Sequence, residues 1–157
     1  MDCWITTHWP VSAAGPDLSR HVYVKSSRAR VPAPGDLVLV YECQTVTVGG
    51  KHRMRADGIV RGRRERIELP KGRGQIIMAL TVTGPRRPIR DDDVVYDYGN
   101  LREWSVIPCK TLKPVRPLPR GDVMELLGQP RDTPPRYWSL WKVPHHFISA
   151  LLARLGL

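Results

Sequence analysis

The sequence predicts an α+β fold in which short strands build one core and helices lie towards the C-terminus. Two continuous apolar runs, Gly35–Cys43 and Gly74–Thr83, are rich in β-branched residues and bounded by turn residues, which is typical of buried strands. Residues 145 to 155 instead carry apolar side chains at helical spacing, with Pro144 before them and Gly156 after them. We therefore expect the Gly35–Cys43 run to be the central strand of a sheet and the last segment to be an amphipathic helix.

The bulk properties favour one compact domain that binds a polyanion. The chain has 157 residues, 41% of them hydrophobic, which is enough for a substantial core. Lys and Arg number 25 against 15 Asp and Glu, and a net charge of +10 makes nucleic acid the first candidate partner. No segment approaches the ~20 apolar residues needed to cross a bilayer, and the N-terminus does not resemble a signal peptide. We expect a cytoplasmic protein with no membrane partner.

The cysteines, histidines and acidic residues lack the spacing of a metal site. Cys3, Cys43 and Cys109 are too far apart in sequence for a zinc pair or a disulfide framework, which indicates a reducing compartment. His145 and His146 are adjacent at a helix start and project in different directions. Asp91–Asp93 lack the spacing of a calcium loop, so we expect them to be solvated. No metal and no other cofactor is expected.

Four further segments have the composition of strands: Cys3–His8, Ile59–Leu69 around Gly62, Leu101–Val106 and Thr111–Leu118. The last two are predicted to be separate strands because Pro108 lies between them. Residues Asp17–Arg30 could form a helix or an extended arm, and their polar and aromatic content favours binding groups. A brief helix is expected over Val123–Leu127, followed by a Pro-rich connector over Gln129–Arg136.

The segment Lys51–Arg73 is strongly basic. It carries nine Lys or Arg and three acidic residues, so more than half of the net charge lies in 23 residues. Such a segment is expected to contact phosphates without regard to base sequence. Together with the preceding arm it supplies the residues predicted to contact a nucleic-acid backbone, which are Lys25, Arg28, Arg30, Arg61, Arg63, Arg64, Arg66, Lys71 and Arg73.

Three short motifs carry a resemblance to a known family. They are Trp4-Ile5 followed by Pro10, then Arg28-Ala29-Arg30 upstream of Gly35-Asp36-Leu37-Val38-Leu39-Val40-Tyr41, and Gly58-Ile59-Val60. Their order resembles an EVE domain of the PUA-like group, which also contains the YTH and ASCH domains, and the resemblance covers residues 3 to about 127. It implies an open β-barrel of about five to six strands over residues 1–128, with the Pro-rich connector and C-terminal helix of residues 129–157 packed on it.

The resemblance also implies a function. EVE sequences commonly carry Lys-Ser-Glu-Pro where this chain has Thr7-His8-Trp9-Pro10, and a Trp-Asp-Gly-Val-Arg-Asn block where His21–Ser26 stand. Those segments line the base pocket of the family, so the resemblance implies the same task with a different preferred base. The expected task is recognition of a modified base, foremost modified cytosine in DNA, flipped out of the duplex as part of a prokaryotic modification-dependent restriction system. A separate nuclease or ATPase is the expected protein partner.

A module that holds a flipped base needs an aromatic face, polar groups for the base edge and cations for the backbone. Trp9, beside a proline at a strand end, suits a pocket, whereas Trp4 and Trp104 suit a core as well as a pocket. Trp138 and Trp141 are expected to be packing residues. The pocket is predicted to be lined by Thr7, His8, Trp9, His21, Tyr23, Ser26, Tyr41 and Trp104.

Two alternatives remain open from the sequence. The first is an RNA-binding PUA-like module, since spacing does not distinguish RNA from DNA. The second is a nucleoside or base hydrolase that uses His8 or His21 with Glu42. The chain shows no nuclease motif, and no Ser, Cys or Lys lies in a known nucleophile motif, so we expect a binding protein rather than an enzyme.

Overall fold

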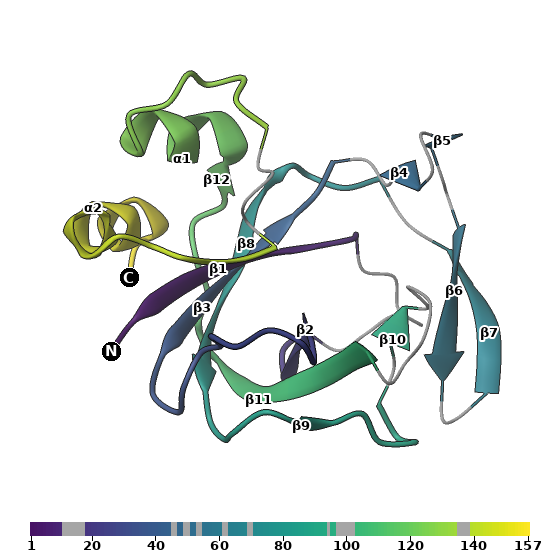
Figure 1. Cartoon of the computed structure of the whole chain (residues 1–157). Coiled ribbons are helices and arrows are strands. Elements are labelled where there is room, and N and C mark those ends of the chain that lie inside the picture. Colours follow the sequence, from purple (N-terminus) through teal and green to yellow (C-terminus); the bar gives the residue numbers. More distant parts are fainter. Residues whose placement is uncertain are drawn as a thin grey trace.

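The computed structural model contains one large curled sheet with two helices packed against it (Figure 1). Six strands follow one another across this sheet: β13 (Ser139–Lys142), β1 (Cys3–His8), β3 (Leu37–Glu42), β8 (Gln75–Val82), β11 (Trp104–Lys113) and β2 (His21–Lys25). Two short strands extend it, because β12 (Leu118–Pro119) pairs with β8 and β9 (Arg87–Pro88) pairs with β11. The structure describes residues 1–10, 18–44, 47–48, 51–52, 55–60, 63–68, 71–93, 95–96, 103–134 and 139–157.

The sheet curls into a half-barrel, so the predicted α+β class is confirmed at the level of an open barrel with helices. The predicted central strand is confirmed as β3, which runs parallel to β1 and antiparallel to β8. All six of its residues are buried because both faces of the strand are covered. The register places Thr7 opposite Tyr41 and His8 opposite Glu42, which fixes the polar ends of the two strands side by side.

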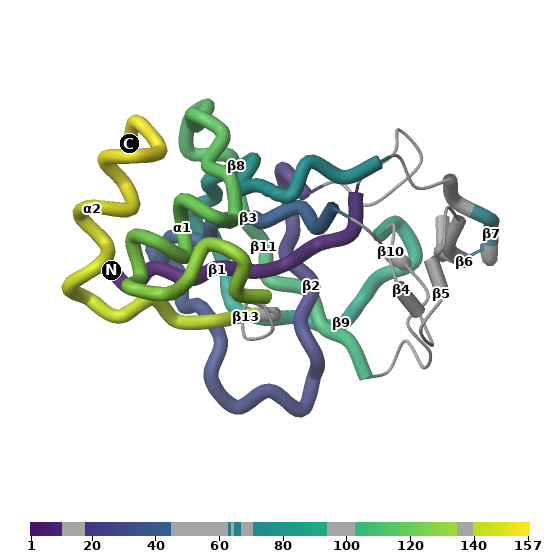
Figure 2. Tube along the Cα trace, turned by 90° about the horizontal axis from the view of Figure 1, so that it is seen from above, coloured from purple at the N-terminus to yellow at the C-terminus, as the bar shows by residue number. Residues whose placement is uncertain are grey.

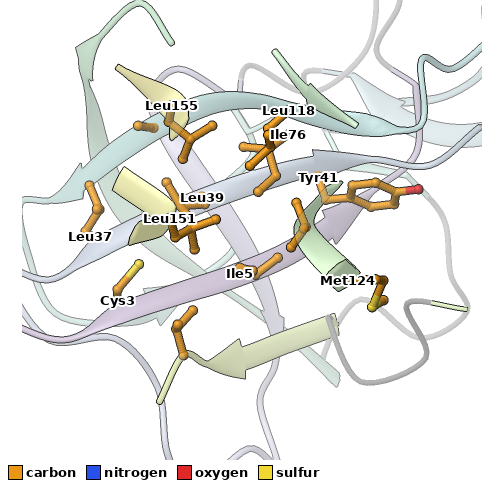
Figure 3. Packing of buried hydrophobic residues seen from close by; sticks show 13 residues of the cluster. Cys3, Ile5, Leu37, Leu39, Tyr41, Ile76, Leu118, Met124, Leu151 and Leu155 are labelled. Carbon is orange, nitrogen blue, oxygen red and sulfur yellow. The ribbon is translucent and has the colours of Figure 1, made fainter. Parts of the chain in front are cut away.

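The sheet separates two hydrophobic clusters. The helix-side cluster lies between the sheet and the helices (Figure 3) and includes Cys3, Ile5, Leu37, Leu39, Tyr41, Ile76, Leu118, Met124, Leu151 and Leu155. The interior cluster fills the inside of the curl and includes Trp4, Val22, Val24, Val38, Val40, Leu80, Val82, Ile107 and Leu140. Side chains alternate between the two faces of a strand. A residue that belongs to one of these clusters therefore shows which face of the sheet it occupies, and its two neighbours in the strand occupy the other face.

Both predicted helices are present. Helix α1 spans Arg120–Leu126 and α2 spans His145–Leu155, where Leu151 and Leu155 are fully buried in the helix-side cluster. Helix α2 ends at Gly156, whose φ of 76° is the left-handed conformation that glycine adopts without a steric cost. The C-terminal helix therefore packs on the same core as the central strand. Within the described residues, no helix is long and apolar enough to cross a membrane.

Two small sheets lie at the other end of the molecule. The strands β10 (Val95–Tyr96), β6 (Arg55–Val60) and β7 (Arg63–Glu68) form a three-stranded sheet, and β4 (Thr47–Val48) pairs with β5 (Lys51–His52). Both views place β6 and β7 opposite the helices (Figures 1 and 2). The expectation of one strand around Gly62 is corrected, because the basic segment forms an antiparallel hairpin with Val60 opposite Arg63.

The predicted break at Pro108 is wrong, because β11 runs through it from Trp104 to Lys113. Cys109 N donates to Arg20 O on the β2 side, and Pro108 O accepts from Thr83 N on the opposite side. The Pro108 nitrogen thus faces the point where β11 changes partner from β9 to β8, and no ladder hydrogen bond is needed there. Pro108 is tolerated because the sheet is already interrupted on that side.

Two of the six strands that follow one another across the large sheet were not specified by the sequence. The open segment Asp17–Arg30 contains strand β2, which pairs with β11 from Lys25 opposite Trp104 to His21 opposite Pro108. Strand β13 follows the Pro-rich connector and pairs with β1. Trp141 lies on β13 and packs, half-buried, against the helix-side cluster, in agreement with the expected packing role. Trp138 lies outside the described residues.

Candidate nucleic-acid interface

The outer face of β2 and β11 brings together four of the residues predicted to bind nucleic acid. Val22 and Val24 belong to the interior cluster, so the alternate residues of β2 occupy the opposite face. The register of β11 adds Trp104, which lies opposite Lys25, to the same face. The shared face carries His21, Tyr23, Lys25 and Trp104. These four residues, together with the neighbouring Arg87 and Asp93, are called the outer-face cluster.

An ion pair that the sequence did not predict holds this cluster. Arg87, on β9, donates from Nη1 to Asp93 Oδ2 at 2.8 Å and from Nη2 to Asp93 Oδ1 at 3.0 Å. Asp93 Oδ2 also accepts from the backbone N–H of Arg90 at 2.7 Å. Arg87 Nη2 lies 3.1 Å from His21 Nε2, which must be the acceptor because a guanidinium can only donate. The Arg87 contact at Nε2 thus orients the His21 ring on the outer face.

The expectation that Asp91–Asp93 are all solvated is wrong for Asp93. Asp91 and Asp92 are exposed, but Asp93 is only 4% exposed. Burial alone would raise the pKa of Asp93, but the hydrogen bonds from Arg87 and Arg90 N and the charge of Arg87 outweigh it and lower the pKa below 3.8. The same hydrogen bonds raise the pKa of Arg87. Asp93 is therefore a structural anion beside His21, and only its pairing with Arg87, six residues before it, reveals this role.

The aromatic groups of the outer face are also ordered by contacts. The ring centroids of His21 and Tyr23 are 6.4 Å apart and the rings are tilted by 54°. Lys25 Nζ lies 5.7 Å from the ring centroid of Trp104, within the range of a cation–π interaction. Ser26 Oγ and Ser105 Oγ share a hydrogen bond of 2.7 Å, which ties the end of β2 to β11. Ser105 lies opposite Val24 of the interior cluster, so this bond is on the other face and Ser26 is not part of the outer-face cluster. The cluster is a half-buried surface of aromatic, cationic and polar groups.

The end of β1 forms a second polar region, on a different face. His8 is 8% exposed, and its Nδ1 donates to the carbonyl of Trp9 at 2.8 Å. Burial lowers the pKa of His8 to about 4, more than the Trp9 carbonyl and the Glu42 charge raise it, so the ring is neutral near pH 7. Trp9 follows it as a half-buried residue. His8 is thus a fixed neutral group at the strand end.

Glu42, at the end of β3 beside His8, forms an ion pair with Arg73. The Glu42 carboxylate accepts from the backbone N–H of Arg73 at 2.9 Å, from Nε at 3.1 Å and from Nη2 at 3.3 Å. Gly72 lies so close to the strand ends that a Cβ would sit 1.7 Å from the Cys43 carbonyl oxygen. Glu42 therefore holds the loop before β8, and half of the Arg73 side chain remains exposed. Neighbouring Lys71 is exposed.

The predicted pocket is not assembled in one place. Tyr41 is 3% exposed and lies in the helix-side cluster near Ile76 and Met124 (Figure 3), where burial raises its pKa. We correct the expected pocket role of Tyr41, since a core side chain offers no face to a base. Thr7 lies opposite Tyr41, and its Oγ1 is buried without a hydrogen-bond partner among the described residues. The sequence could not show which residues of β3 lie under the helices, because the residues on both faces of this strand are apolar.

The expected phosphate-contacting residues occupy four regions, one of which is the loop before β8 that carries Lys71 and Arg73. Lys25 is exposed on the outer face, and Arg28 and Arg30 are exposed on the connector between β2 and β3. Arg63 and Arg66 are exposed on β7, while Arg61 and the side chain of Arg64 lie outside the described residues. Acidic residues stand opposite arginines in the hairpin register at Arg55–Glu68 and Asp57–Arg66. The hairpin therefore carries both signs of charge, with arginine in excess.

In the described part of the chain, no three His, Cys, Asp or Glu side chains are grouped as metal ligands would be. Burial raises the pKa of Cys3 and Cys109 to about 12 and that of Cys43 to about 11, so these thiols stay protonated at neutral pH.

The comparison with known proteins shows a shared fold. No family model matches the chain, and no curated protein matches it. Among solved structures, the NMR structure of Rpa0253 from Rhodopseudomonas palustris, a structural genomics target, superposes with a TM-score of 0.50. The match covers 99% of this chain and 94% of that one at 12% sequence identity. The two chains share their fold over nearly their whole length.

Proposed function

We propose that the protein is a nucleic-acid-binding module that recognises a modified base. The observation that carries the proposal is the outer-face cluster, where His21, Tyr23 and Trp104 lie beside Lys25 and the Arg87–Asp93 pair. Aromatic faces, fixed polar groups and cations are the three features that a flipped base requires. The net charge of +10 supplies the general attraction to a polyanion.

The contacts suggest how a base would be held. A base that stacks on Trp104 replaces Lys25 over the ring, and the exposed Lys25 is then available to a phosphate. The Arg87–Asp93 pair holds the guanidinium against His21 Nε2 and so orients the ring, and such a fixed polar group is what distinguishes the edges of different bases. Modified cytosine in DNA is the ligand we propose first, following the resemblance to EVE domains.

Unstacking a base costs a few kcal/mol, and stacking on aromatic side chains returns about 1–3 kcal/mol per base. Contacts to phosphates must therefore supply the remaining free energy. The exposed arginines of β7, Arg63 and Arg66, and the exposed Lys71 are placed to do so in this proposal. Base preference and general affinity would then depend on different residues, which makes them separable by mutation.

The test is a titration of Tyr23→Ala and Trp104→Ala against paired duplexes with and without modified cytosine. Loss of one stacking face corresponds to a 5- to 150-fold weaker binding of the modified duplex, roughly, with little change in the salt-sensitive binding of the unmodified one. Tyr41→Phe is the control, because that tyrosine lies in the helix-side cluster. Tyr23→Phe keeps the ring and should keep the preference.

Melting curves of each variant exclude loss of folding as the cause. A parallel fall of melting temperature and of both affinities would assign Tyr23 and Trp104 to packing and overturn the proposed site. Tighter binding of single-stranded or duplex RNA than of either DNA would favour the RNA-binding alternative.

A further inference from the structure

A cleft of about 390 Å³ opens where the β2–β3 connector reaches the far edge of the half-barrel. β13 and β2 are the two edge strands of the sheet, and the connector that follows β2 meets β13. The tube view places this connector beside β13 (Figure 2). This seam cleft is lined by Trp4, Arg28, Ala29, Arg30, Leu140, Trp141 and Lys142.

Arg28 is held in place at the seam. Its Nη2 donates to the Leu140 carbonyl on β13, and its own carbonyl accepts from Arg86 Nη1 at 2.6 Å. Arg28 N also donates to Lys25 O at 3.0 Å. A guanidinium has five N–H donors, and one is used here, so an ordered cation with further donors lines the cleft. Such a preformed arrangement lowers the entropic cost of binding.

The opposite wall carries a second cation over an aromatic ring. Lys142 Nζ lies 5.9 Å from the ring centroid of Trp4 and 2.6 Å from Asp2 Oδ2. The acidic groups nearby are Asp2 and Asp36. Asp36 is buried and already accepts from Trp4 Nε1 at 3.1 Å and from the backbone N–H groups of Asp2 and Ala33 at 2.9 Å each. Among the described residues, only the Asp2 side chain, which is 41% exposed, competes with a ligand for Lys142.

Arg30 completes the cleft as an exposed cation. Within the described residues it makes no ion pair, in contrast to Arg73, Arg87 and Arg131. Three cations thus line one concave surface, where Asp36 is bonded elsewhere and Asp2 pairs with Lys142 alone. A compact anion with several acceptor oxygens fits this chemistry, because arginine donates to such oxygens in pairs.

We propose that the seam cleft binds a phosphate group. Its source, which rests on the proposed function, is the backbone of the same nucleic acid whose base occupies the outer-face cluster. Lys25 and Arg28 are three residues apart, a span of at most about 10 Å, so one strand can touch both regions. The cleft then fixes where the strand leaves the base site. A free phosphate or mononucleotide is the other source of the same chemistry.

The test is NMR of the full chain, with the side-chain Nε–H signals of Arg28 and Arg30 and the indole signal of Trp4 as reporters. Inorganic phosphate and a short single-stranded oligonucleotide are titrated separately. Both are expected to shift the three reporters, with the oligonucleotide saturating at lower concentration. Arg30→Ala and Lys142→Ala should each weaken oligonucleotide binding about fivefold and reduce the slope of log affinity against log salt by about 0.7.

Lys110→Ala, which removes an equally exposed charge on β11, is the matched control and should have a smaller effect. Arg30→Lys keeps the charge but not the paired donors, so it should restore the salt slope and only part of the affinity. Two results would refute phosphate binding in the seam cleft while leaving the proposed function intact. One is oligonucleotide binding that does not shift the Arg28, Arg30 and Trp4 signals, and the other is an equal loss of affinity in the Arg30, Lys142 and Lys110 alanine variants. Phosphate shifts without any oligonucleotide binding would overturn the proposed function and assign the cleft to free phosphate.

Discussion

Replacement of Asp93 by Asn tests the ion pair that organises the outer-face cluster. The Asp93 side chain is 2% exposed and that of Arg87 is 17% exposed. Asparagine keeps the size of the side chain, removes its charge and turns one acceptor into a donor that faces the Arg87 guanidinium. Arg87 is then left largely buried without its counter-charge.

The loss of folding free energy in Asp93→Asn follows from the burial of the Arg87–Asp93 pair. Removing one partner of a buried ion pair costs about 3–5 kcal/mol, and the residual exposure of Arg87 places this case at about 3 kcal/mol. For a domain of this size each kcal/mol corresponds to about 2–4 °C, so Asp93→Asn should melt about 6–12 °C below wild type at pH 7. Asp92→Asn is the matched control, since Asp92 is exposed, and should change the free energy of unfolding by less than about 0.5 kcal/mol.

The pH dependence provides an independent check of the same pair. Because the folded-state pKa of Asp93 is lowered from 3.8, its stabilisation is fully present above that pH and is lost as the pH falls through the lowered pKa. The difference in stability between wild type and Asp93→Asn should therefore narrow below about pH 4. Calorimetric melting at pH 7 and pH 3 measures both effects. Equal melting of the Asp93 and Asp92 variants at pH 7 would refute the buried pair.

Three further predictions follow from the strand ends and the hairpin. Alanine at Arg63, Arg64 and Arg66 together should flatten the salt dependence of nucleic-acid binding, and an unchanged slope would place the phosphate contacts elsewhere. Stability should fall as the pH is lowered from about 6.5 to about 4, because the His8 imidazole binds a proton near pH 6.5 in the unfolded chain but has a pKa of about 4 in the folded protein. His8→Gln should flatten this fall, and a folded-state His8 imidazole that titrates near 6.5 by NMR would contradict the prediction. Gly72→Ala should cost at least about 1–3 kcal/mol in urea unfolding, because the new Cβ meets a carbonyl at 1.7 Å, whereas Gly84→Ala meets only ordinary contacts and serves as control.

Elements with strong local signals were predictable. β3 and β8 are continuous apolar runs between turn residues, and α2 has a proline at its start, a glycine at its end and one apolar face. These signals depend on neighbouring residues alone. The proline in β11 misled the prediction because its tolerance depends on a partner change across the sheet, which involves Thr83 and Arg20 far away in sequence.

The site was harder to predict than the fold for a related reason. Tyr23 and Tyr41 both follow valines of the interior cluster and so lie on the opposite face of the sheet, yet Tyr23 is half-exposed and Tyr41 packs under the helices. Only the position of the helices on that face decides between them. Asp93 belongs to a run of three identical residues, and its pairing with Arg87 requires the turn after β9. Alternation within a strand gives two possible faces, while the tertiary fold determines which of them is open.

The central claim is most directly tested by the affinity of the wild-type protein for two duplexes of identical sequence, one with modified and one with unmodified cytosine. Fluorescence anisotropy at several salt concentrations separates the general phosphate contribution from the base preference. The account predicts tighter binding of the modified duplex at every salt concentration, with a similar salt slope for both. Equal affinities for the two duplexes at all salt concentrations would contradict it.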